Sequence, residues 1–281
     1  MVSVADGIYV HVGRQENPST ANHGDIANVG FVVGSKCVAV IDTGGTAEVG
    51  KALHAALREV TSLPICYVIN THVHPDHIFG NAAFVGDADH FVGHVKLAAA
   101  MANRGTNYLN AVKRDLGEAA KGTEVIVPDL GVEDVMTLEL GDRALTLRAW
   151  PTAHTDNDLT VYDEKTATLW LADLLFVARI PVVDGSVRGW LAAIQQLRSL
   201  RPAHVIPGHG RIDPPWPEAL DAEERYLGLL VKEVRSAIKA DRTLQQAVDT
   251  VGLSERDKWL LSDSFHRRNV TAVFAELEWE D

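Results

Sequence analysis

The sequence has little cysteine and no excess of positive charge. Two of its 281 residues are cysteine, and 38 acidic residues outnumber 26 lysine and arginine residues, which gives a formal net charge of −12. Nucleic acids and anionic membranes would repel such a chain, although a local basic patch is compatible with this composition. We therefore expect a small-molecule substrate, no nucleic-acid partner and no membrane partner; the oligomeric state is left open.

Long apolar runs, linkers and repeats are also missing. No stretch reaches the roughly 18 apolar residues of a membrane-spanning helix, and no Gly/Ser linker or internal repeat interrupts the chain. The first residues show no basic stretch followed by an apolar one, so the sequence as written predicts a cytoplasmic protein. The alternative is a periplasmic protein that has lost a signal peptide. With 46% hydrophobic residues, the chain can bury one large core or two smaller ones.

The two cysteines, Cys37 and Cys66, both lie in apolar, strand-like runs. The favoured interpretation is a pair of buried thiols that pack as small hydrophobic side chains. The alternative is a disulfide, which requires that neighbouring strands bring the two residues close together.

Four metal-ligand side chains are concentrated in one short loop after an apolar run that is typical of a buried strand. His72 and His74 are two residues apart, so in an extended segment they point to the same side. Pro75 then turns the chain, which lets Asp76 and His77 face the same place. Imidazole together with carboxylate suits zinc, with iron or manganese as competitors. The loop therefore predicts a metal site.

Three further ligands follow three other strand-like runs: His154, Asp173 and His209. A strand carries a polar group out of the core at its end. Strand ends that deliver His, Asp and His are what we expect of a metal site mounted on a sheet.

This arrangement resembles the metallo-β-lactamase superfamily, whose signature is a His-x-His-x-Asp-His loop followed by a distant His, an Asp or Cys, and a last His. The resemblance implies an α/β (α+β) fold, a four-layer αβ/βα sandwich that forms a single hydrolase domain over residues 1–281. It implies two metal ions, preferably Zn2+, in the same chain. One ion would be held by His72, His74 and His154, the other by Asp76, His77 and His209, with Asp173 bridging the two.

Asp173 separates branches of this superfamily, because the lactamases proper have Cys or Ser at that position. The chain is most similar to quinoprotein relay system zinc metallohydrolases and to hydrolase-like proteins associated with sulfur oxidation, through residues 24–28, 154–160 and 184–190. The resemblance implies hydrolysis of an ester, thioester, lactone or similar acyl bond by a hydroxide held between the metals. Asp76 is the expected catalytic residue, which orients this nucleophile and passes its proton on.

Three alternatives remain open at this level. The first is a mononuclear iron dioxygenase of the same fold that oxidises a persulfide. The second is a non-catalytic binding module with a structural metal site. The third is β-lactam hydrolysis as a side activity.

Other residues are predicted from local patterns. Asp42 ends a strand-like run and is expected either to form a turn or to orient a ligating histidine. Arg179 and Arg188 are candidates for binding a substrate carboxylate, and Trp190 is expected in the core. Helices are expected over residues 46–60, 96–116 and 187–200 and from residue 78 to residue 85, a hairpin around residues 141–142, and a strand over residues 90–94.

Overall fold

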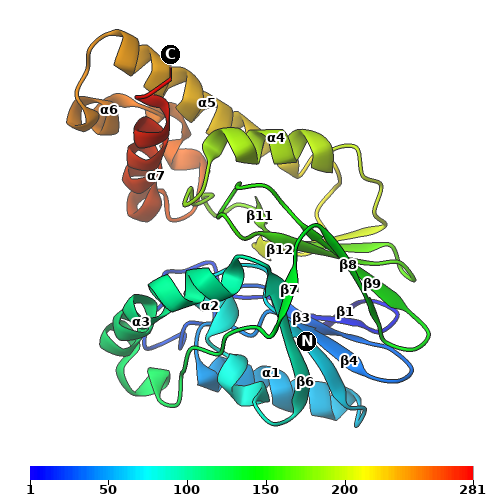
Figure 1. The fold of residues 1–281 in the computed structure, drawn as a ribbon. Helices are drawn as coiled ribbons and strands as arrows, with labels where there is room; N and C mark the ends of the chain where they lie inside the picture. The colour runs from blue at the N-terminus through cyan, green and yellow to red at the C-terminus, as the bar shows by residue number, and fades with distance from the viewer. Residues whose placement is uncertain (281) are drawn as a thin grey trace.

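The computed structural model describes residues 1–280 and consists of two β-sheets that face each other, with helices on the outer side of each (Figure 1). This confirms the mixed α/β sandwich. In the first sheet, the amino-terminal strands are antiparallel and the later ones parallel. Its strands lie side by side in chain order: β1 (Val2–Ala5), β2 (Ile8–His11), β3 (Val29–Val33), β4 (Val38–Ile41), β5 (Ile65–Ile69), β6 (Ala88–His94) and β7 (Leu130–Val132).

The second sheet has the order β12-β11-β10-β9-β8. Its strands β11 and β12 are parallel, and the other neighbours are antiparallel, including the hairpin predicted around residues 141–142. The strands are β8 (Val135–Glu139), β9 (Ala144–Ala149), β10 (Leu159–Asp163), β11 (Thr168–Phe176) and β12 (His204–His209).

Alternation along β4 explains how one strand belongs to two layers, because successive side chains of a strand point to opposite faces. Val38 and Val40 pack with helix α1 (Ala47–Val60) on the outer face. Ala39 and Ile41 pack into the core between the sheets. The α1 helix predicted from the apolar stripe is confirmed, and the side chain of Thr46 caps it.

The prediction of a helix from residue 78 to residue 85 is wrong. Helix α2 (Pro75–Ile78) ends there, and a 3-10 turn, η1 (Asn81–Phe84), follows. The reason is tertiary: the amide of Gly80 donates to the carbonyl of Gly44 at 2.8 Å, so it is not available for a helix bond. A Cβ at Gly80 would collide with the carbonyl oxygen of Thr43.

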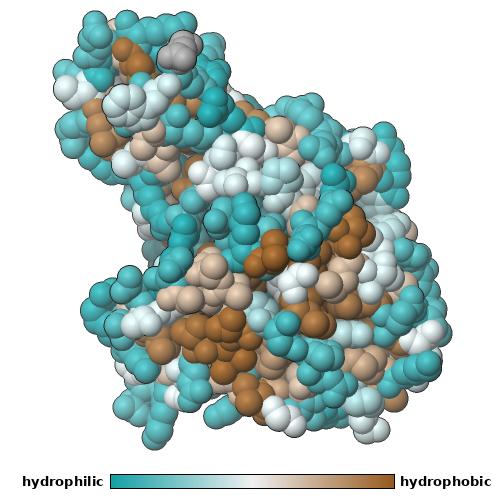
Figure 2. All heavy atoms as spheres, in the orientation of Figure 1, coloured by the Kyte–Doolittle hydropathy of each residue, from teal (hydrophilic) through white to brown (hydrophobic). Residues whose placement is uncertain are grey.

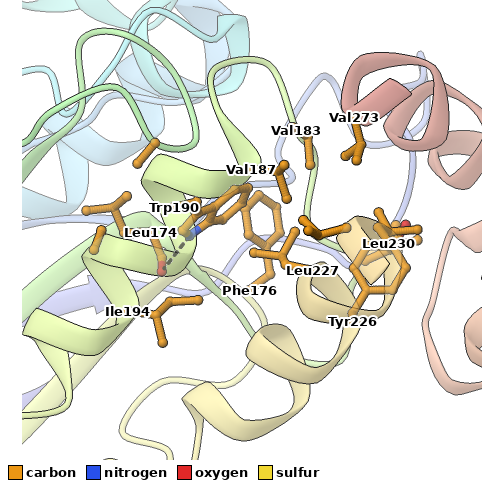
Figure 3. Close-up of a cluster of buried hydrophobic side chains, with 14 of the residues drawn as sticks. Leu174, Phe176, Val183, Val187, Trp190, Ile194, Tyr226, Leu227, Leu230 and Val273 are labelled. Atoms are coloured by element: carbon orange, nitrogen blue, oxygen red, sulfur yellow. Dashed lines mark hydrogen bonds between the residues drawn. The ribbon is translucent and has the colours of Figure 1, made fainter. Parts of the chain in front are cut away.

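The outer helices complete the layers. Helix α3 (Leu97–Leu116) lies outside the first sheet and is followed by the 3-10 turn η2 (Gly117–Ala120). The first of the carboxyl-terminal helices lies over the second sheet, and the last ones form the lobe at the upper left of Figure 1. Figure 3 shows the apolar cluster beneath them, where Trp190 packs against Phe176 with ring centroids 6.0 Å apart. Trp190 is thus a core residue, as predicted. These helices are α4 (Val187–Leu197), α5 (Leu220–Lys239), α6 (Leu244–Thr250), the 3-10 helix η3 (Leu253–Lys258) and α7 (Ser262–Leu277).

The two cysteines form a disulfide, so the favoured interpretation of free thiols is wrong. Strands β4 and β5 are parallel neighbours, and their pairing places the Cα atoms of Cys37 and Cys66 5.7 Å apart. Within residues 1–280, no helix is both long enough and apolar enough to cross a membrane.

Candidate metal centre

The histidine-rich loop leaves the first sheet at the end of β5 and leads into α2. His74 occupies the N-cap of α2 with extended backbone angles, and Pro75 is its first residue. Proline suits this position because its fixed φ is helical and its missing N–H would have no partner there. The turn places Asp76 and His77 on the first turn of the helix, which confirms the predicted change of direction.

The remaining ligand candidates come from the second sheet. His154 lies in the loop between β9 and β10, and His209 is the last residue of β12. Asp173 differs from expectation, since it lies inside β11 and not beyond its end. The strand is irregular at Ala172, which has φ of 47°, and this irregularity turns the carboxylate toward the site. A Cβ on Gly208 would collide with that carboxylate, so the neighbouring strand requires glycine there.

The structure brings all seven predicted ligands together as two adjacent groups. In each group the potential ligand atoms lie within 4.8 Å of one another. Asp173 lies between the groups: its Oδ2 is 3.4 Å from Nε2 of His154 and 3.4 Å from Nε2 of His209, and its Oδ1 is 3.1 Å from Nε2 of His77. The first group is His72, His74, His154 and Asp173, and the second is Asp76, His77 and His209.

Each imidazole is held by an acceptor on one nitrogen, which leaves the other nitrogen facing inward. In three of the rings, Nδ1 contacts an uncharged oxygen atom of a hydroxyl or carbonyl group. These contacts are His72 to Oγ1 of Thr71 at 3.1 Å, His154 to the carbonyl of Val182 at 2.7 Å, and His209 to the carbonyl of Ile26 at 2.8 Å. Such partners fix the ring tautomer and orientation, as they do for metal-ligating histidines.

Carboxylates hold the other two rings. Oδ2 of Asp42 lies 2.8 Å from Nδ1 of His77, which confirms the orienting role among the two predicted for Asp42. Asp42 also accepts hydrogen bonds from the amide and the hydroxyl of Thr71 at 2.8 and 2.7 Å. His74 is turned the other way, with its Nε2 3.0 Å from Oδ2 of Asp184 and its Nδ1 2.9 Å from Nε2 of His154.

Unpartnered atoms at the centre test whether a cation fits. Nε2 of His72 is buried and has no hydrogen-bond partner within residues 1–280. Nε2 of His77 and Oδ1 of Asp173 are also buried, and although they lie 3.1 Å apart, neither has a partner with hydrogen-bond geometry among these residues. Buried polar atoms are nearly always paired, and a bound ion is one accepted reason for an exception. Inward-facing nitrogen and oxygen atoms are the donor set that a divalent metal requires, so the residues present fit a metal ion.

The electrostatics agree with this. Burial lowers the pKa of His72 well below its ordinary value, and burial together with nearby His74 lowers the pKa of His154 to about 3, so both rings are neutral, the form in which an imidazole can bind a metal ion. Burial alone would raise the pKa of Asp173, but the imidazoles of His209, His77 and His72 hold it well below its usual range. Burial would likewise lower the pKa of His77, but the surrounding carboxylates, chiefly Asp173, raise it. Their negative field favours positive charge at this ring, which a cation supplies.

A pocket of about 270 Å³ opens beside the ligands. Figure 2 shows the molecule hollowed at its left edge between the carboxyl-terminal lobe and the layer that carries α3, and residues of α3 and α7 line the pocket. Asp76, Asp173, His74 and His209 contribute to its floor. Its walls are largely apolar: Pro18, Ile26, Ala111, Val112, Leu116, Phe176, Val182 and Phe265.

Of the two arginines predicted to bind a substrate carboxylate, one lines the pocket and the other does not. Arg179 lines the pocket and is buried. Arg188 was predicted wrongly, because its side chain pairs with Glu276 and Glu280 and does not line the pocket. Asp184 was missed as a partner of a ligand, although it follows an apolar run as Asp42 does; it also pairs with Arg104.

Known proteins resemble this chain in sequence pattern and in fold. A family model described as "Metallo-beta-lactamase superfamily" matches residues 24–209. The fold is similar to that of a metallo-beta-lactamase from Pontibacter korlensis, with a TM-score of 0.65 at 19% identity, over 81% of this chain and 97% of that one. It is also similar to a double mutant of the sec-alkyl sulfatase PisA1, with a TM-score of 0.72 at 16% identity, over 99% of this chain and 50% of that one.

One curated relative is similar in sequence over a shorter stretch. It is the "Linear primary-alkylsulfatase" of Pseudomonas sp. (strain ATCC 19151), 35% identical over 60 residues, which is 21% of this chain. The match spans about a tenth of that protein, 11% of its length.

Proposed function

This chain belongs to the metallo-β-lactamase superfamily. We propose that it is a metal-dependent hydrolase that holds two zinc ions and cleaves an ester-type bond in a small molecule with an apolar group. The position of Asp173 carries the proposal, since its two carboxylate oxygens face both groups of ligands. One carboxylate between two sets of imidazoles is suited to bridging two cations. The apolar walls of the adjoining pocket favour a substrate with an apolar part.

The proposed ligands divide between the two ions as the two groups do. His72, His74 and His154 would hold one ion, Asp76, His77 and His209 the other, and Asp173 both. Mixed imidazole and carboxylate ligands favour zinc, with iron or manganese as the competing metals. Bound cations would supply Lewis acidity, which generates a nucleophile from water at neutral pH and polarises the bond under attack.

Asp76 is our proposed catalytic residue. It lines the pocket, and its Oδ2 lies 3.4 Å from Nε2 of His209. Burial would raise the pKa of this carboxyl, but His77 and His209 lower it below its ordinary value, so it is ionised at neutral pH. An ionised carboxylate at the floor of the pocket can orient the attacking water and accept its proton.

Two kinds of scissile bond fit this pocket. Carboxylic ester, thioester or lactone bonds are the first, since a bridging Asp in place of Cys or Ser resembles hydrolases of acyl bonds. Sulfate esters are the second, and one observation favours them: the fold likeness to the sec-alkyl sulfatase extends over 99% of this chain, beyond the residues that match the family model. This chain spans half of that protein, so sulfate-ester hydrolysis by this chain is a proposal.

The Cys37–Cys66 disulfide supports the periplasmic alternative for the location, because disulfides persist in oxidising compartments. We further propose that residues 1–281 form one domain. The apolar cluster that includes Trp190 joins residues of the second sheet to residues of α5 and α7, so these helices share a core with the sheet.

Elemental analysis and a matched pair of substrates test the function. We expect about two zinc ions per chain, and turnover that a chelator abolishes, with either monooctyl succinate or octyl sulfate as substrate. Both molecules carry an octyl chain and one negative charge, so preference for the succinate or the sulfate decides between the two bond classes. One iron per chain with oxygen uptake would replace the proposal by the dioxygenase. A metal-loaded protein that hydrolyses neither acyl esters nor sulfate esters would overturn the proposed function. If such a protein turned over only β-lactams, and slowly, β-lactam hydrolysis would be the one activity left.

A further inference from the structure

Arg179 is a buried cation that the proposed hydrolytic chemistry does not use. Its side chain lines the pocket next to the proposed metal ligands, and only 4% of the residue is exposed. Its Nε has no hydrogen-bond partner within residues 1–280. The carboxylates whose charge acts on it are Asp76 and Asp173, both proposed metal ligands, and neither forms a hydrogen bond with this Nε. A buried charge without a partner is costly, and removing a partner from such a charge destabilises a protein strongly. The position therefore calls for a partner from outside the chain.

The nearest polar contact of Arg179 does not supply that partner. Its Nη1 lies 3.0 Å from Nδ1 of His209, but the same Nδ1 lies 2.8 Å from the carbonyl of Ile26. A ring nitrogen that donates its proton to a carbonyl has no lone pair left to accept from a guanidinium. The ring of Phe265 is 5.7 Å from Cζ of Arg179, a cation–π contact that holds the group at the pocket wall.

The backbone fixes Arg179 in place. The residue before it, Ala178, has φ of 65°, and Leu261 on the facing segment has φ of 62°. Between them, the amide of Leu260 donates to the carbonyl of Ala178 at 2.9 Å, and the amide of Ile180 donates to the carbonyl of Leu260 at 3.1 Å. Non-glycine residues in this left-handed region are strained, and such strain is found preferentially at ligand-binding sites.

We propose that Arg179 binds an anionic group of the substrate, so that the pocket selects amphiphiles with a negative charge beside the scissile bond. The guanidinium lies at the pocket wall beside the proposed ligand His209, while Val112, Leu116 and Phe265 offer apolar surface for the rest of the molecule. A planar guanidinium suits carboxylate, sulfate or sulfonate oxygens. Asp76 and Asp173 do not compete for it, because both are proposed to ligate the metal ions. This inference rests on the proposed function and names its substrate class.

Binding of two unreactive ligands tests the inference on the metal-loaded protein. Octane-1-sulfonate and octan-1-ol share a chain length and differ in charge, and calorimetry gives the affinity of each. We expect Arg179→Met to weaken sulfonate binding about tenfold to a hundredfold, the usual range for hydrogen bonds to a charged group, and to leave octanol binding unchanged. Arg179→Lys should retain part of the preference for the sulfonate.

Arg201→Met is the matched control, because this arginine is exposed and bonds only to backbone carbonyls among the described residues. It should bind both ligands as the wild type does. Wild-type sulfonate affinity in Arg179→Met and Arg179→Lys, at unchanged metal content, would overturn the inference, and so would an equal loss for both ligands. Since no turnover is measured, a protein that selects the sulfonate but hydrolyses nothing would sink the proposed function and keep this inference.

Discussion

Replacing Asp42 by asparagine should weaken metal binding at the group formed by Asp76, His77 and His209. Asp42 is 1% exposed and accepts three hydrogen bonds, two from Thr71 and one from Nδ1 of His77. An ionised carboxylate only accepts, whereas an asparagine side chain must place an NH2 donor on one of its two positions. The substitution keeps the size of the side chain and reverses the role of one atom.

Both orientations of the asparagine are unfavourable. If its NH2 takes the place of Oδ2, His77 must accept at Nδ1, which moves the ring proton to Nε2 and blocks the atom that faces Asp173. If the NH2 takes the place of Oδ1, it meets the amide N–H of Thr71, and two buried donors oppose each other. An unsatisfied buried donor costs about 1 to 3 kcal/mol. Loss of a partner that orients a ligand typically costs 10-fold to 100-fold in metal affinity.

A competition titration with a chromophoric zinc chelator measures this loss. We expect one of two zinc ions to bind about 10-fold to 100-fold more weakly in Asp42→Asn, and the other to bind nearly as in the wild type. Asp129→Asn is the control, since Asp129 also accepts from a histidine ring, His90 at 2.7 Å, and from a backbone amide, Phe91 at 2.6 Å, but lies exposed and away from the site. If Asp42→Asn bound both ions as tightly as the control does, the orienting role of Asp42 would be refuted.

Three further predictions concern other groups in the structure. Asp173→Ala should reduce the metal content by about one ion per chain in elemental analysis, and unchanged content would refute the bridging role. Burial raises the pKa of Glu223 well above its usual range, so the native state keeps a proton that the unfolded chain releases above about pH 4.3. Stability should therefore fall as pH rises from that value toward the folded pKa, by at most about 1.4 kcal/mol per pH unit. Glu223→Gln mimics the protonated acid and should flatten the slope in urea unfolding between pH 5 and pH 8; parallel curves would contradict this. Replacing both Cys37 and Cys66 by alanine opens a loop with a sequence separation of 29 and should lower the free energy of unfolding by about 3 to 4 kcal/mol under oxidising conditions. No difference from the wild type would argue against the bridge.

Local sequence signals predicted the candidate ligands of the histidine-rich loop, because this loop follows local rules. His72, His74, Asp76 and His77 lie within six residues, and the pattern of extended strand, proline and helix start decides where each one points. Strand content and the apolar stripe of α1 were predicted for the same reason, since periods of 2 and 3.6 are visible within a few residues.

Features that depend on the pairing of distant segments could not be predicted in this way. Asp184 and His74 are 110 residues apart and meet only when the two sheets face each other. The partner of Cys37 is decided by the register of β4 against β5. The helix expected after Ile78 fails because the amide of Gly80 bonds to a loop 36 positions earlier in the chain. In each case a contact formed by the fold overrides a local preference.

The segment that follows Asp173 separates the chemistry of this site from its selectivity. Asp173 and Asp184 act on the metal site, the first as a proposed bridging ligand and the second through His74. Between them, Phe176, Arg179 and Val182 line the pocket and none of them is a proposed ligand. Contacts with the histidines of the proposed metal site fix Asp173 and Asp184 in place. The three residues between them set the shape and charge of the pocket wall that a substrate meets. Substitutions there should change which molecule is bound while the metal content stays constant, so that one ligand set can serve different ester-type substrates.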